Sequence, residues 1–293
     1  RLISAAKLRS AQNAISNMLA YEQSLRSVYD RLSGCEGASE VVKPFAAGTG
    51  ERTAVVLVTS NRALCGGFNA GLAKTFEEQD FDIGTTTVYA IGKFGYKAVR
   101  KLGFEAENLC AMAEKADYAA SAALAEKLVS QFLDGKLSRV VLIYSHFASM
   151  SNVPVKVETY LPMVPGESSG EPCGTDYIVE PSPVEVLEHL LPKVLKLSLH
   201  TVLLDAQAAE HAARSLAMQM ATDNGNNLLA ELSLQYNKLR QQAITNEILD
   251  LAGGLELNLV DIGHHCGGGK LAVGVECCDE TLGNEVIDQF LVV

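Results

Sequence analysis

A single hydrophobic stripe runs along the first 34 residues. Apolar or aromatic side chains recur there at alternating intervals of three and four residues, with one acidic exception at Glu22. The stripe consists of Leu8, Ala11, Ile15, Met18, Glu22, Leu25, Tyr29 and Leu32. This heptad spacing is typical of a helix that packs along a partner helix. Because no glycine or proline occurs before Gly34, the pattern predicts one long helix over residues 1–34.

A different pattern covers residues 52–164, where apolar runs rich in β-branched residues alternate with helical periodicity. The strand-like runs are Thr53–Thr59, Thr86–Ile91, Arg139–Tyr144 and Val153–Leu161, and the helical segments are Asn69–Gln79, Lys93–Leu102 and Asp117–Leu133. This alternation predicts a largely parallel sheet covered by helices, in a Rossmann-like α/β domain. The segment "SHFASMSN" between the last two runs is too short for a helical crossover, so we expect a hairpin there.

A proline-rich loop, residues 165–182, leads to a second long helical pattern over residues 183–253. Ser182 as the N-cap, Pro183 at the first helical position and Glu185 at the third form a helix start. Pro192 is expected to kink or break this helix. A second stripe follows as if to meet the N-terminal helix, and it consists of Leu229, Leu232, Tyr236, Leu239 and Ala243.

The segment "MATDNGNNL", residues 220–228, interrupts this helical pattern with residues that form helices poorly. One interpretation is a break in the helix. The favoured one is that small polar residues let another backbone come close, with Gly225 at the contact. The patterns together predict an α/β protein: an antiparallel coiled coil of N- and C-terminal long helices plus a Rossmann-like α/β domain.

Residues 255–293 form an acidic tail with seven acidic residues, one lysine and no heptad. Zinc binding is conceivable there through side chains at His264, His265, Cys266, Cys277 and Cys278, but no Cys-x2-Cys pair occurs. Thiols on an acidic segment are the favoured interpretation, and the role of the tail stays open.

The composition excludes some function classes. The net charge of −11 disfavours a groove for nucleic acid, and no apolar run approaches the length of a membrane span. Seven cysteines without framework spacing indicate reduced thiols in a cytosolic-type compartment.

Candidate chemistry centres on "VVLVTSNRALCGGFNAGLAKTF", which reads as a strand, a glycine-containing turn and a helix. The turn has neither the Lys-Ser/Thr of a P-loop nor the spacing of a dinucleotide turn, so we expect no nucleotide and no cofactor there. Arg62 could neutralise an anion. An alternative function is a Cys/His hydrolase on the α/β domain, with Cys65 as nucleophile and His146 as base.

Three segments resemble the gamma subunit of the F-type (F1Fo) ATP synthase. They are "AAKLRSAQ" at 5–12, "TSNRALCGGFN" at 59–69 and "EHAARSLAMQMATDNGNNLLAELSLQYNKLRQQAITNEI" at 210–248. The resemblance covers about residues 2–253. In that family the first helix begins roughly twenty residues earlier and the chain usually ends near "LDLAGG", so we expect a shorter shaft and a tail without counterpart.

The resemblance implies a non-catalytic central rotor stalk that couples proton-driven rotation to ATP synthesis. Its implied partners are the alpha and beta subunits of the catalytic ring, an epsilon-type subunit and the membrane c-ring, with one copy per complex and no nucleic acid. The implied location is the cytoplasmic face of a bacterial inner membrane, as a peripheral protein. A coiled-coil scaffold unrelated to this machine is a further alternative.

The resemblance also implies two sets of site residues. Contact between rotor and catalytic ring is assigned to Arg240, Gln241, Asp223 and Asn224. The foot turn, part of the fold and contact surface of the α/β domain, contains Arg62, Leu64, Cys65, Gly66 and Gly67. The resemblance implies no catalytic, metal-binding or cofactor-binding residue.

Overall fold

The computed structural model describes residues 2–35, 37–114, 116–163 and 179–265. The chain divides into two compact units, Arg1–Gly225 and Asn226–Val293. Each unit is described by itself.

A five-stranded sheet forms the centre of the first unit, in the order β3-β2-β1-β4-β5. Its strands are β1 (Arg52–Val58), β2 (Thr86–Ile91), β3 (Glu105–Asn108), β4 (Leu137–Ser145) and β5 (Val155–Leu161). The pairs β1–β2, β1–β4 and β2–β3 are parallel, and β4–β5 is antiparallel. The predicted parallel sheet and the predicted hairpin are both confirmed.

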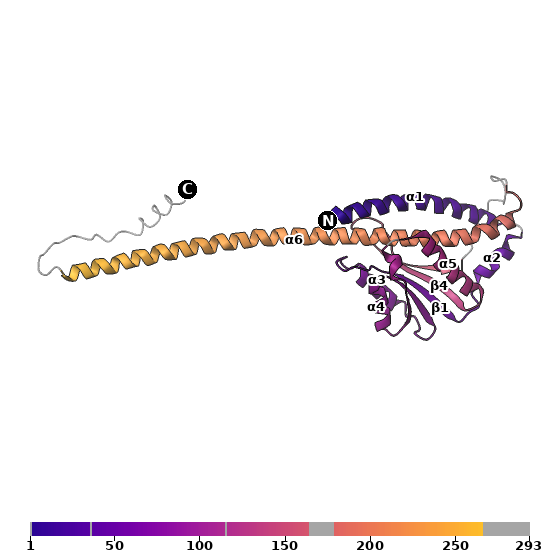
Figure 1. Cartoon of the computed structure of the whole chain (residues 1–293), viewed down its shortest axis with the longest axis horizontal. Helices are drawn as coiled ribbons and strands as arrows, with labels where there is room; N and C mark the ends of the chain where they lie inside the picture. Colours follow the sequence, from indigo (N-terminus) through magenta and orange to yellow (C-terminus); the bar gives the residue numbers. More distant parts are fainter. Residues whose placement is uncertain (1, 36, 115, 164–178, 266–293) are drawn as a thin grey trace. The chain divides into compact units, whose positions relative to one another are not determined.

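Helices cover both faces of this sheet (Figure 1). On one face, α3 (Phe68–Glu78) and α4 (Lys93–Lys101) pack on side chains such as Val55 and Leu57. On the other face, α5 (Tyr118–Leu133) and the long helices pack on side chains such as Val56. Since alternate residues of β1 face opposite layers, burial on both sides explains its continuous apolar sequence.

The helix α1 (Leu2–Ser33) lies alongside the first part of α6 (Pro183–His265) (Figure 1). All eight positions of the predicted stripe are buried or half-buried. Tyr29 and Leu32, near the end of α1, share a core with Leu187 near the start of α6, whereas Glu22 receives hydrogen bonds further along, around Thr201. The two helices therefore run antiparallel, which confirms the predicted coiled coil for this part of α6.

The start of α6 follows the prediction, but its course differs at Pro192. The Glu185 N–H donates to Ser182 Oγ at 3.3 Å, so Ser182 caps the helix. Pro192 lies inside the helix, so of the predicted kink or break, the break is wrong. Leu187 and Leu191 on the same helix are fully buried. We attribute the continuity to this packing, which offsets the hydrogen bond that proline cannot make.

The segment at residues 220–228 is also helical, so the interpretation as a helix break is wrong. The favoured interpretation is not confirmed either, because no described atom lies within 4 Å of a Cβ built on Gly225. The propensity penalties of Asp, Asn and Gly are each within about 1 kcal/mol, which a cooperative helix tolerates.

The side chains of the second stripe are mostly exposed on α6. Leu229, Leu232, Tyr236 and Leu239 are 50–66% exposed. The residues of α6 that share the core with α1 come earlier in the helix. At its end, α6 reaches His265, beyond the predicted boundary at residue 253. The remainder of the tail lies outside the described residues.

Three short elements were not predicted: α2 (Ala38–Ala46), β3 and the 3-10 helix η1 (Cys110–Ala113). The expectation of uniformly reduced cysteines is wrong at Cys35, which is disulfide-bonded, whereas Cys65 and Cys110 are free. Near Cys35, a glycine at position 37 has a φ of 83°.

Candidate functional site

The foot turn, defined as residues 60–69, connects the carboxyl end of β1 to α3. Its direction reverses through two residues with left-handed backbone, Leu64 at φ 68° and Gly66 at φ 60°. Leu64 is 72% exposed, whereas Cys65 beside it is only 2% exposed. The turn thus exposes the apolar side chain of Leu64 to solvent and buries the neighbouring side chain of Cys65.

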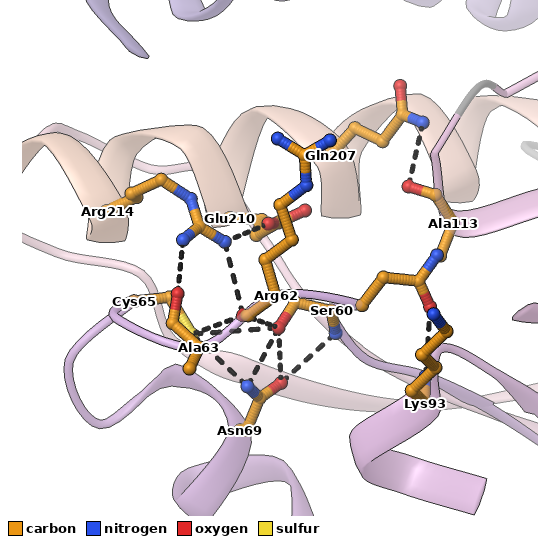
Figure 2. Close-up of polar contacts among 11 residues, drawn as sticks. Ser60, Arg62, Ala63, Cys65, Asn69, Lys93, Ala113, Gln207, Glu210 and Arg214 are labelled. Atoms are coloured by element: carbon orange, nitrogen blue, oxygen red, sulfur yellow. Dashed lines mark hydrogen bonds and ion pairs between the residues drawn. The ribbon is translucent and has the colours of Figure 1, made fainter.

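A hydrogen-bond network inside the turn holds this shape (Figure 2). Asn69 Nδ2 donates to Ser60 Oγ at 2.8 Å and to Cys65 Sγ at 3.2 Å. Ser60 Oγ donates to the Arg62 carbonyl at 2.8 Å, and the Ser60 N–H donates to Asn69 Oδ1 at 3.1 Å. The Cys65 thiol is therefore a buried member of a structural network.

The turn is also tied to the neighbouring strand ends. Asn61 Nδ2 donates to the Cys110 carbonyl at 2.8 Å, and Asn61 Oδ1 accepts from the Lys93 N–H at 3.0 Å. Thr59 Oγ1 accepts from the Gly95 N–H at 2.8 Å. These bonds bring the carboxyl ends of β1, β2 and β3 together. In doubly wound sheets this edge is the usual ligand crevice.

Polar side chains of α6 cover this edge (Figure 2). The Arg214 guanidinium donates to the carbonyls of Ala63 and Arg62, the latter at 3.3 Å, and pairs with Glu210 at 2.5 Å. The Arg214 and Glu210 side chains are only 15% and 13% exposed. Gln207 Nε2 donates to the Ala113 carbonyl at 3.4 Å. Arg214 therefore bonds the Ala63 carbonyl and adds a second donor to the Arg62 carbonyl, which already accepts the Ser60 hydroxyl.

A cavity of about 150 Å³ lies between the turn, η1 and the two long helices. It is lined by Lys7, Asn61, Arg62, Ala113, Glu114, Glu210, His211 and Arg214. Burial lowers the pKa of His211 below its ordinary value. Glu210 opposes this shift, and Lys7 and Arg214 add to it. This shift favours the neutral imidazole, which limits the positive charge around the cavity.

The site residues predicted from the sequence lie in two separate regions, the foot turn and the surface of α6. Arg62, Leu64, Cys65, Gly66 and Gly67 gather in the one turn. Asp223, Asn224, Arg240 and Gln241 are exposed on α6, and Gln219 Nε2 donates to both carboxylate oxygens of Asp223 at 3.0 Å.

Sequence reasoning missed the side chains that hold the turn, namely Asn69, Glu210 and Arg214, and also Gln207, which bonds η1 beside it. The one available signal was the spacing of Glu210 and Arg214, four residues apart on a helix. That spacing predicts an ion pair between the two side chains. It does not indicate that Arg214 also binds the turn.

The two residues of the hydrolase alternative have different partners. His146 Nδ1 lies 2.6 Å from Asp205 Oδ2, while Cys65 Sγ contacts Asn69 and Ser60. Nothing among the described contacts joins the imidazole to the thiol. Within the described residues there is also no group of three or more candidate metal ligands, and no helix is long and apolar enough to cross a membrane.

Sequence comparison identifies the family of the chain. Residues 1–256 match the profile of the family described as ATP synthase. The chain is 44% identical to the ATP synthase gamma chain of Phocaeicola vulgatus, over 87% of this chain and 91% of the relative. The corresponding gamma chain of Geotalea daltonii is 35% identical, over 87% and 90%. The chain belongs to the ATP synthase gamma chain family.

Solved structures share the fold. A chain of the Euglena gracilis mitochondrial ATP synthase, in an OSCP/F1/c-ring structure, superposes with a TM-score of 0.54 at 16% identity, over 93% of this chain and 98% of that one. A chain from the central stalk/c-ring structure of the Tetrahymena thermophila mitochondrial enzyme gives 0.50 at 20% identity, over 75% and 99%. The hydrolase alternative finds no support among these relatives.

Proposed function

We propose that this chain is the central rotor stalk of a proton-translocating ATP synthase and is itself non-catalytic. In this role, torque from ion flow turns α6 inside a ring of catalytic alpha and beta subunits. An asymmetric shaft then favours a different state at each catalytic site, because each site meets a different surface of the rotor.

The observation that carries this proposal is the apolar surface of the second unit. Large apolar side chains there are 48–72% exposed, at Leu228, Leu229, Leu232, Leu234, Tyr236, Leu239, Ile244, Ile248, Leu249 and Leu251. An apolar surface of this extent on a soluble protein marks an interaction site. A helix whose apolar side chains stay exposed also gains little stability by itself. Protein subunits that surround the helix would bury these apolar side chains and would also stabilise the helix.

The further partners follow from the same role. We propose that the α/β unit contacts an epsilon-type subunit and the c-ring, with one copy of this chain per complex. The curated relatives named above are bacterial, which supports a peripheral position at the cytoplasmic face of the inner membrane.

Two groups of residues are proposed to contact the catalytic ring. Arg240 and Gln241 are exposed on α6, where a guanidinium could bind a carboxylate of the ring with two hydrogen bonds. Asp223 and Asn224 are assigned to the same contact. The foot turn, with the exposed Leu64, is proposed to belong to the separate contact surface of the α/β domain.

Reconstitution with purified alpha and beta subunits tests the proposal. We expect a complex that contains one copy of this chain per catalytic ring and hydrolyses ATP, while the chain alone hydrolyses none. Failure to join a ring that assembles from the same subunits with a known gamma chain would contradict the proposal. Hydrolysis of ATP by the chain alone would contradict its non-catalytic part.

A further inference from the structure

Arg214 stands out because it joins two segments that are 151 residues apart in the chain. Its guanidinium donates to two consecutive carbonyls of the foot turn and pairs with Glu210 one helical turn away on α6. A planar guanidinium can serve several acceptors at once, which a lysine ammonium does with less directional precision.

The position of this contact matters as much as its chemistry. The carboxyl edge of β1, β2 and β3 is where a doubly wound sheet ordinarily receives a ligand. Here Arg214 and Gln207 of α6 donate hydrogen bonds to carbonyls along that edge, and Glu210 pairs with Arg214 (Figure 2). The ligand edge of the sheet is thereby one of the places where the α/β domain contacts α6.

We propose that Arg214 is a positioning residue that locks the foot turn to α6, so that force on the turn is passed to the helix. This role rests on the proposed rotor function. The contact of Arg214 with the foot turn is a property of the free chain, so it can be tested separately from the rotor function. Without the guanidinium, the carbonyls of Arg62 and Ala63 lose a charge-assisted partner, and the turn opens more often while its internal network remains.

Cys65 provides a direct reporter of this opening. Its thiol is free, 2% exposed and located within the turn that Arg214 holds. A thiol reagent can reach it only when the turn opens, so the labelling rate under native conditions measures the open population. Cys110 is also free and is partly exposed, so it serves as an internal reference.

The experiment compares Arg214→Ala, Arg214→Lys and a control, Lys7→Ala. Lys7 lines the same cavity from α1, so its removal changes the local charge and leaves the contact of Arg214 with the turn in place. We expect labelling of Cys65, mapped by mass spectrometry, to accelerate by about tenfold or more in Arg214→Ala. Arg214→Lys should give a smaller acceleration, and Lys7→Ala should match the unsubstituted chain. Labelling of Cys110, which is already partly exposed although its carbonyl accepts from Asn61 of the turn, should change much less than labelling of Cys65.

The second measurement uses the assembled enzyme in vesicles. With Arg214→Ala, we expect ATP hydrolysis to persist while the protons pumped per ATP hydrolysed decrease, with partial recovery in Arg214→Lys. A merely structural residue would lower assembly and hydrolysis together and leave this ratio unchanged.

The outcomes separate the two proposals. An unchanged labelling rate of Cys65 in Arg214→Ala would overturn the lock, whatever the enzyme does. Faster labelling with an unchanged pumping ratio would overturn the role in force transfer and leave the rotor function intact. Failure of the unsubstituted chain to couple at all would overturn the rotor function and the force-transfer role with it.

Discussion

His146 Nδ1 lies 2.6 Å from Asp205 Oδ2, so the residue that follows β4 is bonded directly to α6. The other carboxylate oxygen of Asp205 accepts the Phe147 N–H at 3.0 Å. Asp205 is 8% exposed, so one nearly buried carboxylate satisfies two donors of the same loop. This pair fixes the sheet to α6 on the opposite side of β1 from β2.

Replacing Asp205 by alanine should destabilise the first unit by about 1–3 kcal/mol, because the Phe147 N–H loses its buried acceptor. For a unit of this size, each kcal/mol corresponds to a fall of about 2–4 °C in melting temperature. Asp205→Asn keeps one oxygen acceptor and should cost less. Equal melting temperatures for Asp205→Ala and the unsubstituted chain would show that the pair contributes no stability.

The Glu22 carboxyl predicts how stability varies with pH. Burial raises its pKa above the ordinary value of 4.5, although hydrogen bonds from Thr201 and Ser198 and the charge of Arg26 oppose the shift. Since the folded state holds this proton more tightly than the unfolded state, the buried carboxylate costs stability above its folded pKa. That cost disappears as the pH falls below 4.5.

Glu22→Gln should therefore increase the free energy of unfolding at pH 7, and the gain should shrink as the pH falls towards 4.5. Denaturant titrations of both proteins between pH 4 and pH 8 measure the difference. Glu77→Gln, at an exposed carboxylate of α3 that does not contribute to the shift at Glu22, is the control. A constant difference across this range would contradict the assigned cause.

Gly92 should tolerate no side chain. Its φ is 115°, and a Cβ there would lie 2.3 Å from the Thr59 carbonyl oxygen. Gly92→Ala should cost more than about 3 kcal/mol, because backbone must move and the conformation is strained. Gly67 in the foot turn is the matched control, since a Cβ there meets nothing within 4 Å. Gly67→Ala should stay within about 0.5 kcal/mol by denaturant titration.

Arg240 and Gln241 test the proposed contact with the catalytic ring. Both are exposed, so Arg240→Ala should leave folding of the free chain within about 0.5 kcal/mol. In the assembled enzyme, loss of a partly desolvated ion pair should weaken the contact by about 2–5 kcal/mol, and ATP synthesis should fall much more than assembly. Normal synthesis by the Arg240→Ala, Gln241→Ala double variant would remove these residues from the mechanism.

Much of the fold could be predicted because periodic patterns record which side of an element is buried. The stripe from Leu8 to Leu32 gave α1 and its packing face, and the apolar run of β1 indicated burial on both sides. The sequence around Cys65, Gly66 and Gly67 was enough to locate the foot turn. These features are local, since helix and strand geometry alone fix the spacing.

Only the tertiary structure decided the rest. β3, with the sequence "EAEN", has no strand-like pattern and exists through its pairing with β2. Pro192 stays helical among buried leucines, against its own preference. Arg214 meets Ala63, and Asp205 meets His146, across long stretches of chain. Such contacts leave no periodic trace in the sequence, because they depend on where folding brings distant segments together and on which buried polar groups then need partners.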